Sequence, residues 1–147
     1  MKNLRIRPVL LIAAAGVCLS HPLHSLGAEP DLKFSARLLA VDANEGSAVF
    51  DVNKDGVLDV VAGRNWFAGP DYAPRALRAI EDNRGYVHSN GDFPHDVDGD
   101  GWTDVVSMSF FTTEIHWYKN PGAEVLKLGL LWEKHLLVDT GMSRNEA

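Results

Sequence analysis

Apolar residues beyond position 30 occur in short runs that Gly, Pro, Asn and Asp interrupt, and no segment keeps a helical period. Short runs of branched and aromatic residues between turn residues are typical of β-strands. The pattern predicts strands at 34–39, 48–50, 58–62, 76–80, 103–109, 114–118 and 132–138, with a loop around 83–93. We therefore expect an all-β fold.

The chain also repeats itself. Residues 51–61 (DVNKDGVLDVV) match residues 96–106 (DVDGDGWTDVV) at an offset of 45 positions. A looser element recurs at 37–42, 77–82 and 135–139, and the aromatic pairs Trp66-Phe67 and Trp117-Tyr118 each precede a proline. The order in each unit is strand, acidic loop, strand, aromatic strand and turn. This period and strand content are typical of a β-propeller blade.

The two acidic segments, called here the first Asp loop (51–59) and the second Asp loop (96–104), share the pattern D-x-D/N-x-D-G-x-x-D. Alternate oxygen-bearing side chains in a tight turn can converge on one hard cation, and calcium takes about six to eight oxygens. The glycine in each loop, Gly56 or Gly101, permits the sharp bend. The pattern predicts two calcium sites, with ligands Asp51, Asn53, Asp55, the Val57 carbonyl and Asp59, and Asp96, Asp98, Asp100, the Trp102 carbonyl and Asp104.

Three other interpretations of the loops are weaker. An EF-hand needs a bidentate Glu at the twelfth loop position, where this chain has Ala62 and Ser107, and its flanks are helical, unlike these β-rich ones. Solvated Asx-turns between strands would explain one such loop. Two copies that match at every acidic, amide and glycine position favour a cation, since carboxylates crowded together repel each other. Magnesium prefers water ligands and strict octahedral geometry, so calcium fits better.

The loops, the Asp-Val-Val after each glycine turn and the segment Trp-Tyr-Lys-Asn-Pro-Gly at 117–122 together resemble FG-GAP/VCBS repeats. The resemblance is good over 47–122 and looser over 34–139, and it departs from the family at 62–65, where the usual Gly-Ala-Pro is absent. It implies a partial, integrin-alpha-like β-propeller of four-stranded blades within 29–147. About two blades and part of a third are expected, with calcium bound in the loop that joins two strands of a blade. Further blades, in a longer chain or an oligomer, are expected to complete the ring.

The N-terminus has the layout of a signal peptide. Lys2, Arg5 and Arg7 precede an apolar run at 9–19, and Ala28 suits the residue before a cleavage site. The run is too short for a membrane span of about 20 residues. We therefore predict that 1–28 is a signal peptide and that the protein is secreted or periplasmic. An uncleaved anchor is the alternative, and lipidation at Cys18 is disfavoured because Val17 is too large for its position.

Removal of 1–28 would take away three of the 14 basic residues, none of the 20 acidic residues and the single cysteine, leaving a net charge of −9. Such acidity argues against nucleic acid and anionic membranes as partners. The absence of cysteine from the mature chain excludes disulfides and thiol chemistry.

The leading functional interpretation is a non-catalytic module that binds or scaffolds a carbohydrate or an extracellular protein. The alternative is the propeller part of a secreted carbohydrate-active enzyme, similar to a polysaccharide lyase or an aldos-2-ulose dehydratase. Lyase chemistry needs a general base near a cation. His95, next to Asp96, is the one candidate base, although a loop or strand histidine is the simpler interpretation. The aromatic pairs fit core packing better than sugar stacking.

Overall fold

The computed structural model describes residues 32–145. The predicted signal peptide, 1–28, lies outside these residues. The chain divides into two compact units, Met1–Ser35 and Ala36–Ala147. Of the first unit only 32–35 are described, and they form no regular structure. All the described strands and the helix lie in the second unit.

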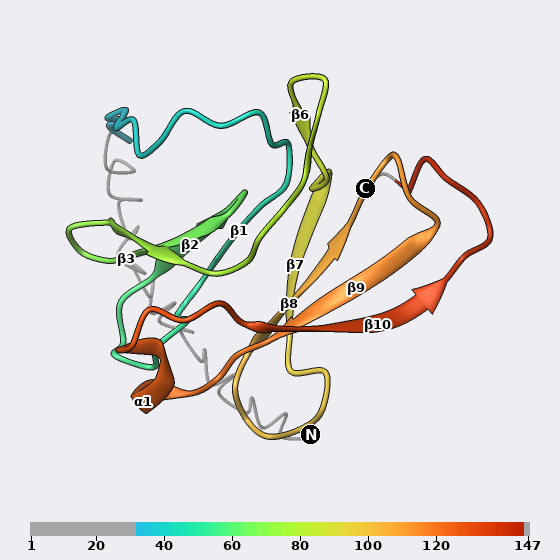
Figure 1. Cartoon of the computed structure of the whole chain (residues 1–147). Coiled ribbons are helices and arrows are strands. Elements are labelled where there is room, and N and C mark those ends of the chain that lie inside the picture. The colour runs from blue at the N-terminus through green and yellow to red at the C-terminus, as the bar shows by residue number, and fades with distance from the viewer. Residues whose placement is uncertain (1–31, 146–147) are drawn as a thin grey trace, which may run out of the picture. The chain divides into compact units, whose positions relative to one another are not determined.

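Two antiparallel four-stranded sheets dominate this unit (Figure 1), so the all-β expectation is confirmed. The first sheet runs in chain order through β1 (Ser47–Phe50), β2 (Asp59–Ala62), β3 (Asn65–Ala68) and β4 (Ala73–Ala76). The second likewise follows chain order through β7 (Gly91–His95), β8 (Asp104–Met108), β9 (Glu114–Lys119) and β10 (Glu133–Asp139). Each sheet is therefore a simple meander.

The connections between the strands differ in length and structure. A small hairpin of β5 (Asp82–Asn83) and β6 (Tyr86–Val87) lies between the two sheets in the chain. A single helical turn, α1 (Ala123–Leu126), joins β9 to β10. Within residues 32–145 no helix is long and apolar enough to cross a membrane.

The sequence repeat corresponds to the sheet repeat. The first Asp loop joins β1 to β2, and the second Asp loop joins β7 to β8. Each aromatic pair lies on the next strand, where Trp66 pairs with Val61 and Trp117 pairs with Val106. Both loops therefore occupy the same position in equivalent sheets.

The core takes side chains from both sheets. Val61 and Trp66 of the first sheet belong to the same buried cluster as Val105 and Tyr118 of the second. Trp132, only 4% exposed, joins this cluster, and its backbone N–H donates to the Leu77 carbonyl at 2.7 Å. The sheets also approach each other through β1 and β7. The loops are thus attached to a shared core.

Several predicted strands are wrong. Residues 34–39 form no strand and are almost all exposed, because no strand pairs with them. In 76–80 only Ala76 belongs to a strand, because the chain turns away from the sheet there: Leu77 and Arg78 are buried consecutively and both donate to the Arg64 carbonyl. The predicted loop at 83–93 holds part of the β5–β6 hairpin and the start of β7. The other five predicted strands are confirmed within two residues at each end.

Candidate metal centre

The first Asp loop is folded around its own acidic side chains. Asp51 accepts hydrogen bonds from the backbone N–H groups of Asp55 (3.1 Å) and Gly56 (2.8 Å). The side-chain Oδ1 of Asn53 accepts from the Asp55 N–H at 3.0 Å, and the side-chain Oδ1 of Asp55 accepts from the Val57 N–H at 2.8 Å. Gly56 has a φ of 85°, the left-handed conformation predicted for the bend.

The second Asp loop reproduces this arrangement. Asp96 accepts from the Gly101 N–H at 2.9 Å, and Asp98 accepts from the Asp100 N–H at 3.2 Å. Asp100 accepts from the Trp102 N–H at 2.8 Å, and Gly101 has a φ of 88°. Equivalent bonds at equivalent positions show that the two loops share one conformation.

The last aspartate of each loop is completely buried. Asp59 accepts from the N–H groups of Val52 (2.8 Å) and Gly69 (2.7 Å). These bonds tie the start of the loop to the residue that follows β3. Burial raises the pKa of Asp59, an effect that the two bonds oppose and the nearby Asp55 and Asp51 carboxylates reinforce.

Asp104 does the same in the second loop, accepting from the N–H groups of Val97 (2.9 Å) and Asn120 (2.8 Å). Its pKa is also raised by burial, with a smaller contribution from the charges of Asp98 and Asp100. Each loop therefore holds a buried carboxylate beside other carboxylates, which is the electrostatic setting that a bound cation stabilises.

The geometry of the second loop fits a metal ion. One carboxylate oxygen from each of Asp96, Asp98 and Asp104 lies within 4.8 Å of the others. Ligands at about 2.3–2.6 Å from calcium can be separated by up to about 5 Å across the ion, so these three could share one. Asp96 Oδ1 is buried and has no hydrogen-bond partner among the described residues, which leaves a lone pair for a ligand. All-oxygen donors suit a hard cation.

Among the described residues, the candidate ligands that converge closely enough to share an ion are Asp96, Asp98 and Asp104 of the second loop, and no such group forms in the first loop. In the first loop, Asn53 takes the place of Asp98, and its amide N–H donates to Asp55 at 2.9 Å. Val57 and Trp102 lie beside the acidic side chains through their N–H groups.

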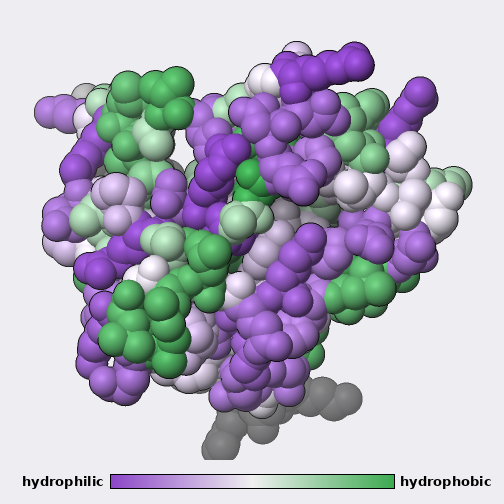
Figure 2. Space-filling view, viewed as in Figure 1, coloured by the Kyte–Doolittle hydropathy of each residue, from purple (hydrophilic) through white to green (hydrophobic). Residues whose placement is uncertain are grey.

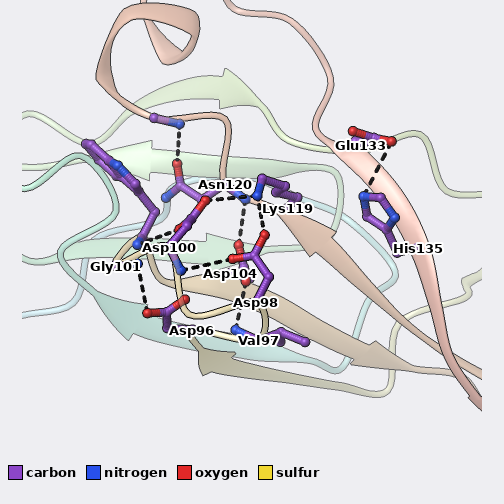
Figure 3. A network of polar contacts seen from close by, with 12 residues as sticks. Asp96, Val97, Asp98, Asp100, Gly101, Asp104, Lys119, Asn120, Glu133 and His135 are labelled. Atoms are coloured by element: carbon purple, nitrogen blue, oxygen red, sulfur yellow. Dashed lines mark hydrogen bonds and ion pairs between the residues drawn. The ribbon is translucent and has the colours of Figure 1, made fainter.

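A lysine outside the D-x-D/N-x-D-G-x-x-D pattern contacts the second loop. Lys119, the last residue of β9, places its ammonium against Asp98 and within 2.9 Å of Asp100 (Figure 3). This contact raises the pKa of Lys119 and lowers that of Asp100. The sequence does not indicate this contact, because the contact depends on the tertiary position of the end of β9 relative to the loop.

Asn120 is a second residue outside the D-x-D/N-x-D-G-x-x-D pattern that contacts the loops. Its side-chain amide donates to the carbonyl of Val52 in the first loop (2.9 Å) and to that of Thr103 in the second (3.1 Å). It is 1% exposed. One buried side chain therefore joins the two loops.

A polar cleft of about 420 Å³ lies at the other end of the second sheet. Its lining includes Glu81, His88, Glu114, His116 and Lys134. His116 Nε2 is 3.2 Å from Glu114, while burial, followed by the charge of Lys134, lowers the pKa of His116. His88 Nε2 is buried without a hydrogen-bond partner in the described part of the chain. His95, the base considered from the sequence, is exposed at the end of β7 and does not line this cleft.

Comparison of the chain with models of protein families, with curated proteins and with solved structures found no match.

Proposed function

We propose that this protein is an exported calcium-binding module of the FG-GAP/VCBS type, which binds a carbohydrate or an extracellular protein. The observation that carries the proposal is the repetition of one loop conformation, with its buried closing aspartate, at the same place in two sheets. Calcium would be held by the ten residues named above and would neutralise each group of carboxylates. Export would depend on the predicted signal peptide at 1–28.

The proposed architecture is part of a β-propeller in which each four-stranded sheet is a blade. Ala48 and Trp66 of the first sheet are 7% and 2% exposed, because the second sheet covers their face. Their equivalents in the second sheet, Phe93 and Trp117, lie on a face with less cover: Phe93 is 40% exposed. Leu136, Leu137 and Val138 of β10 are also exposed, and apolar areas lie on the surface (green in Figure 2). A further blade, in a longer chain or another copy, would cover this face.

The polar cleft is the proposed place for a carbohydrate. It is lined by carboxylates, hydroxyls, imidazoles and one ammonium, which together offer both donors and acceptors to sugar hydroxyls. The β8–β9 connection contributes to it, so it lies at the end of the strands opposite to the second Asp loop. Calcium would act there indirectly, by fixing the strands that line the cleft.

Calcium titration by isothermal calorimetry, backed by a metal count after dialysis, tests the calcium proposal. The mature chain should bind two ions, and Asp51→Asn and Asp96→Asn should each lower the count to one. Glu124→Gln, an exposed glutamate outside the loops, is the control and should leave two. Calcium at a hundredfold excess over Kd should add about 2.7 kcal/mol of stability. Identical melting in calcium and in EGTA would refute calcium binding.

A glycan array tests the ligand. Binding should be lost with Glu114→Gln or His116→Gln and kept with Glu124→Gln. An array without any bound glycan would refute a carbohydrate partner and leave an extracellular protein as the expected one.

The alternative function, the propeller part of a polysaccharide lyase-like or aldos-2-ulose dehydratase-like enzyme, is favoured by one observation. His116 and His88 lie in the same cleft as two glutamates, and the lowered pKa of His116 suits a neutral imidazole that accepts a proton. Lyase action on a uronate polymer forms an unsaturated product that absorbs in the ultraviolet. Absorbance that grows with the wild type and not with His116→Gln would support this function.

A further inference from the structure

The two Asp loops differ in one neighbouring residue. Gly69 and Asn120 are equivalent, because each donates its backbone N–H to the closing aspartate of its loop, Asp59 or Asp104. The residues before them are therefore also equivalent. They are Ala68, which is 4% exposed, and Lys119.

Lys119 brings a positive charge to the oxygens that the proposed ion would need. Its ammonium contacts Asp98 and lies 2.9 Å from Asp100, and its side chain is 34% exposed. Asp98 also belongs to the group of three carboxylates that converge closely enough to share a metal ion. An ammonium and a divalent cation repel each other at such separations. An ion can therefore use Asp98 and Asp100 fully only after Lys119 has moved away.

The first loop has no such competitor among the described residues. The methyl group of Ala68 stands where Lys119 would be, and no ion pair to Asp51, Asp55 or Asp59 occurs in residues 32–145. The neighbouring cation, Lys54, instead lies over the Trp102 ring of the second loop at 4.4 Å. The second loop thus has one cation in contact with its carboxylates, and the first loop has none among the described residues.

We propose that Lys119 is the internal counter-ion of the second Asp loop and makes the two calcium sites unequal. The first loop binds calcium tightly, and the second binds it weakly, because the ion must displace a tethered ammonium. This inference rests on the proposed calcium function. It assigns Lys119 the role of setting affinity, which the sequence motif gives to no residue.

The test is calcium titration of the full chain by calorimetry, with Lys119→Met as the main variant. Methionine keeps much of the apolar stem and removes the charge. Charged hydrogen bonds contribute enough to change a binding constant about tenfold to a hundredfold, so the weak site should tighten by that factor. The tight site should change by less than about twofold. Lys33→Met, at an exposed lysine outside both loops, is the control and should change neither site.

Loop variants assign the sites and separate the possible failures. Asp96→Asn should remove the weak site in the wild-type background, and Asp51→Asn should remove the tight one. Equal affinities in the wild type, loss of the tight site in Asp96→Asn, or a Lys119→Met titration like that of the wild type would each overturn the role of Lys119 while calcium binding stands. Absence of calcium binding in the wild type and in Lys119→Met would overturn both proposals.

Discussion

The most demanding prediction concerns a buried ion pair that joins the two sheets. Arg78 Nη2 is 2.7 Å from Asp92, and neither side chain has any exposed surface. Arg78 Nε donates to the carbonyl of Gly63 (2.8 Å), in the turn between β2 and β3, and the guanidinium lies 5.0 Å from the Tyr118 ring of β9. Removal of either charge would leave the other one buried without an opposite charge.

The magnitude follows from this geometry. Loss of one member of a buried pair costs about 3–5 kcal/mol, because a buried charge is left uncompensated. Asp92→Ala should therefore lower the free energy of unfolding by that amount. In a unit of this size, about 3–6 °C of melting temperature correspond to each kcal/mol, so the melting temperature should fall by about 9–30 °C. Urea unfolding of wild type and variant in saturating calcium measures it, with calcium held equal because binding itself adds stability.

Two further variants make this prediction refutable. The double change Arg78→Met with Asp92→Leu removes both charges and should recover most of the loss, to within about 2 kcal/mol of the wild type. Glu124→Gln breaks a fully solvated pair with Lys127 and should cost less than about 1 kcal/mol. If Asp92→Ala is as mild as Glu124→Gln, or if the double variant is as unstable as the single one, then the pair does not hold the sheets together.

Three other predictions concern single residues. Asp104→Asn places an amide N–H against one of two backbone donors, Val97 or Asn120. The free energy of unfolding in urea should fall by about 1–3 kcal/mol even in EGTA. An unchanged midpoint would contradict the closing role of Asp104. Gly101→Ala forces a side chain into a left-handed bend, so the free energy of unfolding in the same assay should fall by about 1–2 kcal/mol. Equal stability would mean that the backbone of the bend can adjust. Trp132→Ala empties a core position that is 4% exposed and should cost about 3–5 kcal/mol by calorimetry, whereas a loss below 1 kcal/mol would place Trp132 outside the core.

The Asp loops could be predicted because their conformation is encoded locally. Asp51 and Asp96 accept N–H groups only four or five positions away, and Gly56 and Gly101 adopt the one backbone region that favours glycine. These short-range bonds set the bend of the turn itself. A repeated local pattern therefore located both loops.

The strands that the sequence did not reveal lie at sheet edges. β4 contains Pro74 and β7 contains Pro94, and each is an edge strand of its sheet. Proline is tolerated there because an edge strand has one side without ladder partners. A single sequence presents these segments as turn-rich and polar, so only the pairing of Pro74 with Phe67 and Pro94 with Val105 identifies them as strands.

Charged residues at buried positions escape prediction for a different reason. Arg78 and Asp92 are 14 positions apart and resemble ordinary surface residues in sequence. Their burial is tolerated only because the two opposite charges pair with each other. This pairing depends on the path of the chain between the two sheets. Lys119 is hidden in the same way, since its position on β9 is local while its contact with Asp98 is tertiary.

The two loops also cannot be understood one repeat at a time. Asn120 follows β9 of the second sheet, yet its amide donates to Val52 in the first Asp loop. Lys54 of the first loop in turn lies over Trp102 of the second. Each loop is therefore completed by residues that belong to the other repeat. A 45-residue segment cut out at the repeat boundary would contain every motif residue of one site. It would lack the contacts that position those residues. The smallest unit that can hold a well-formed Asp loop is therefore the pair of neighbouring sheets.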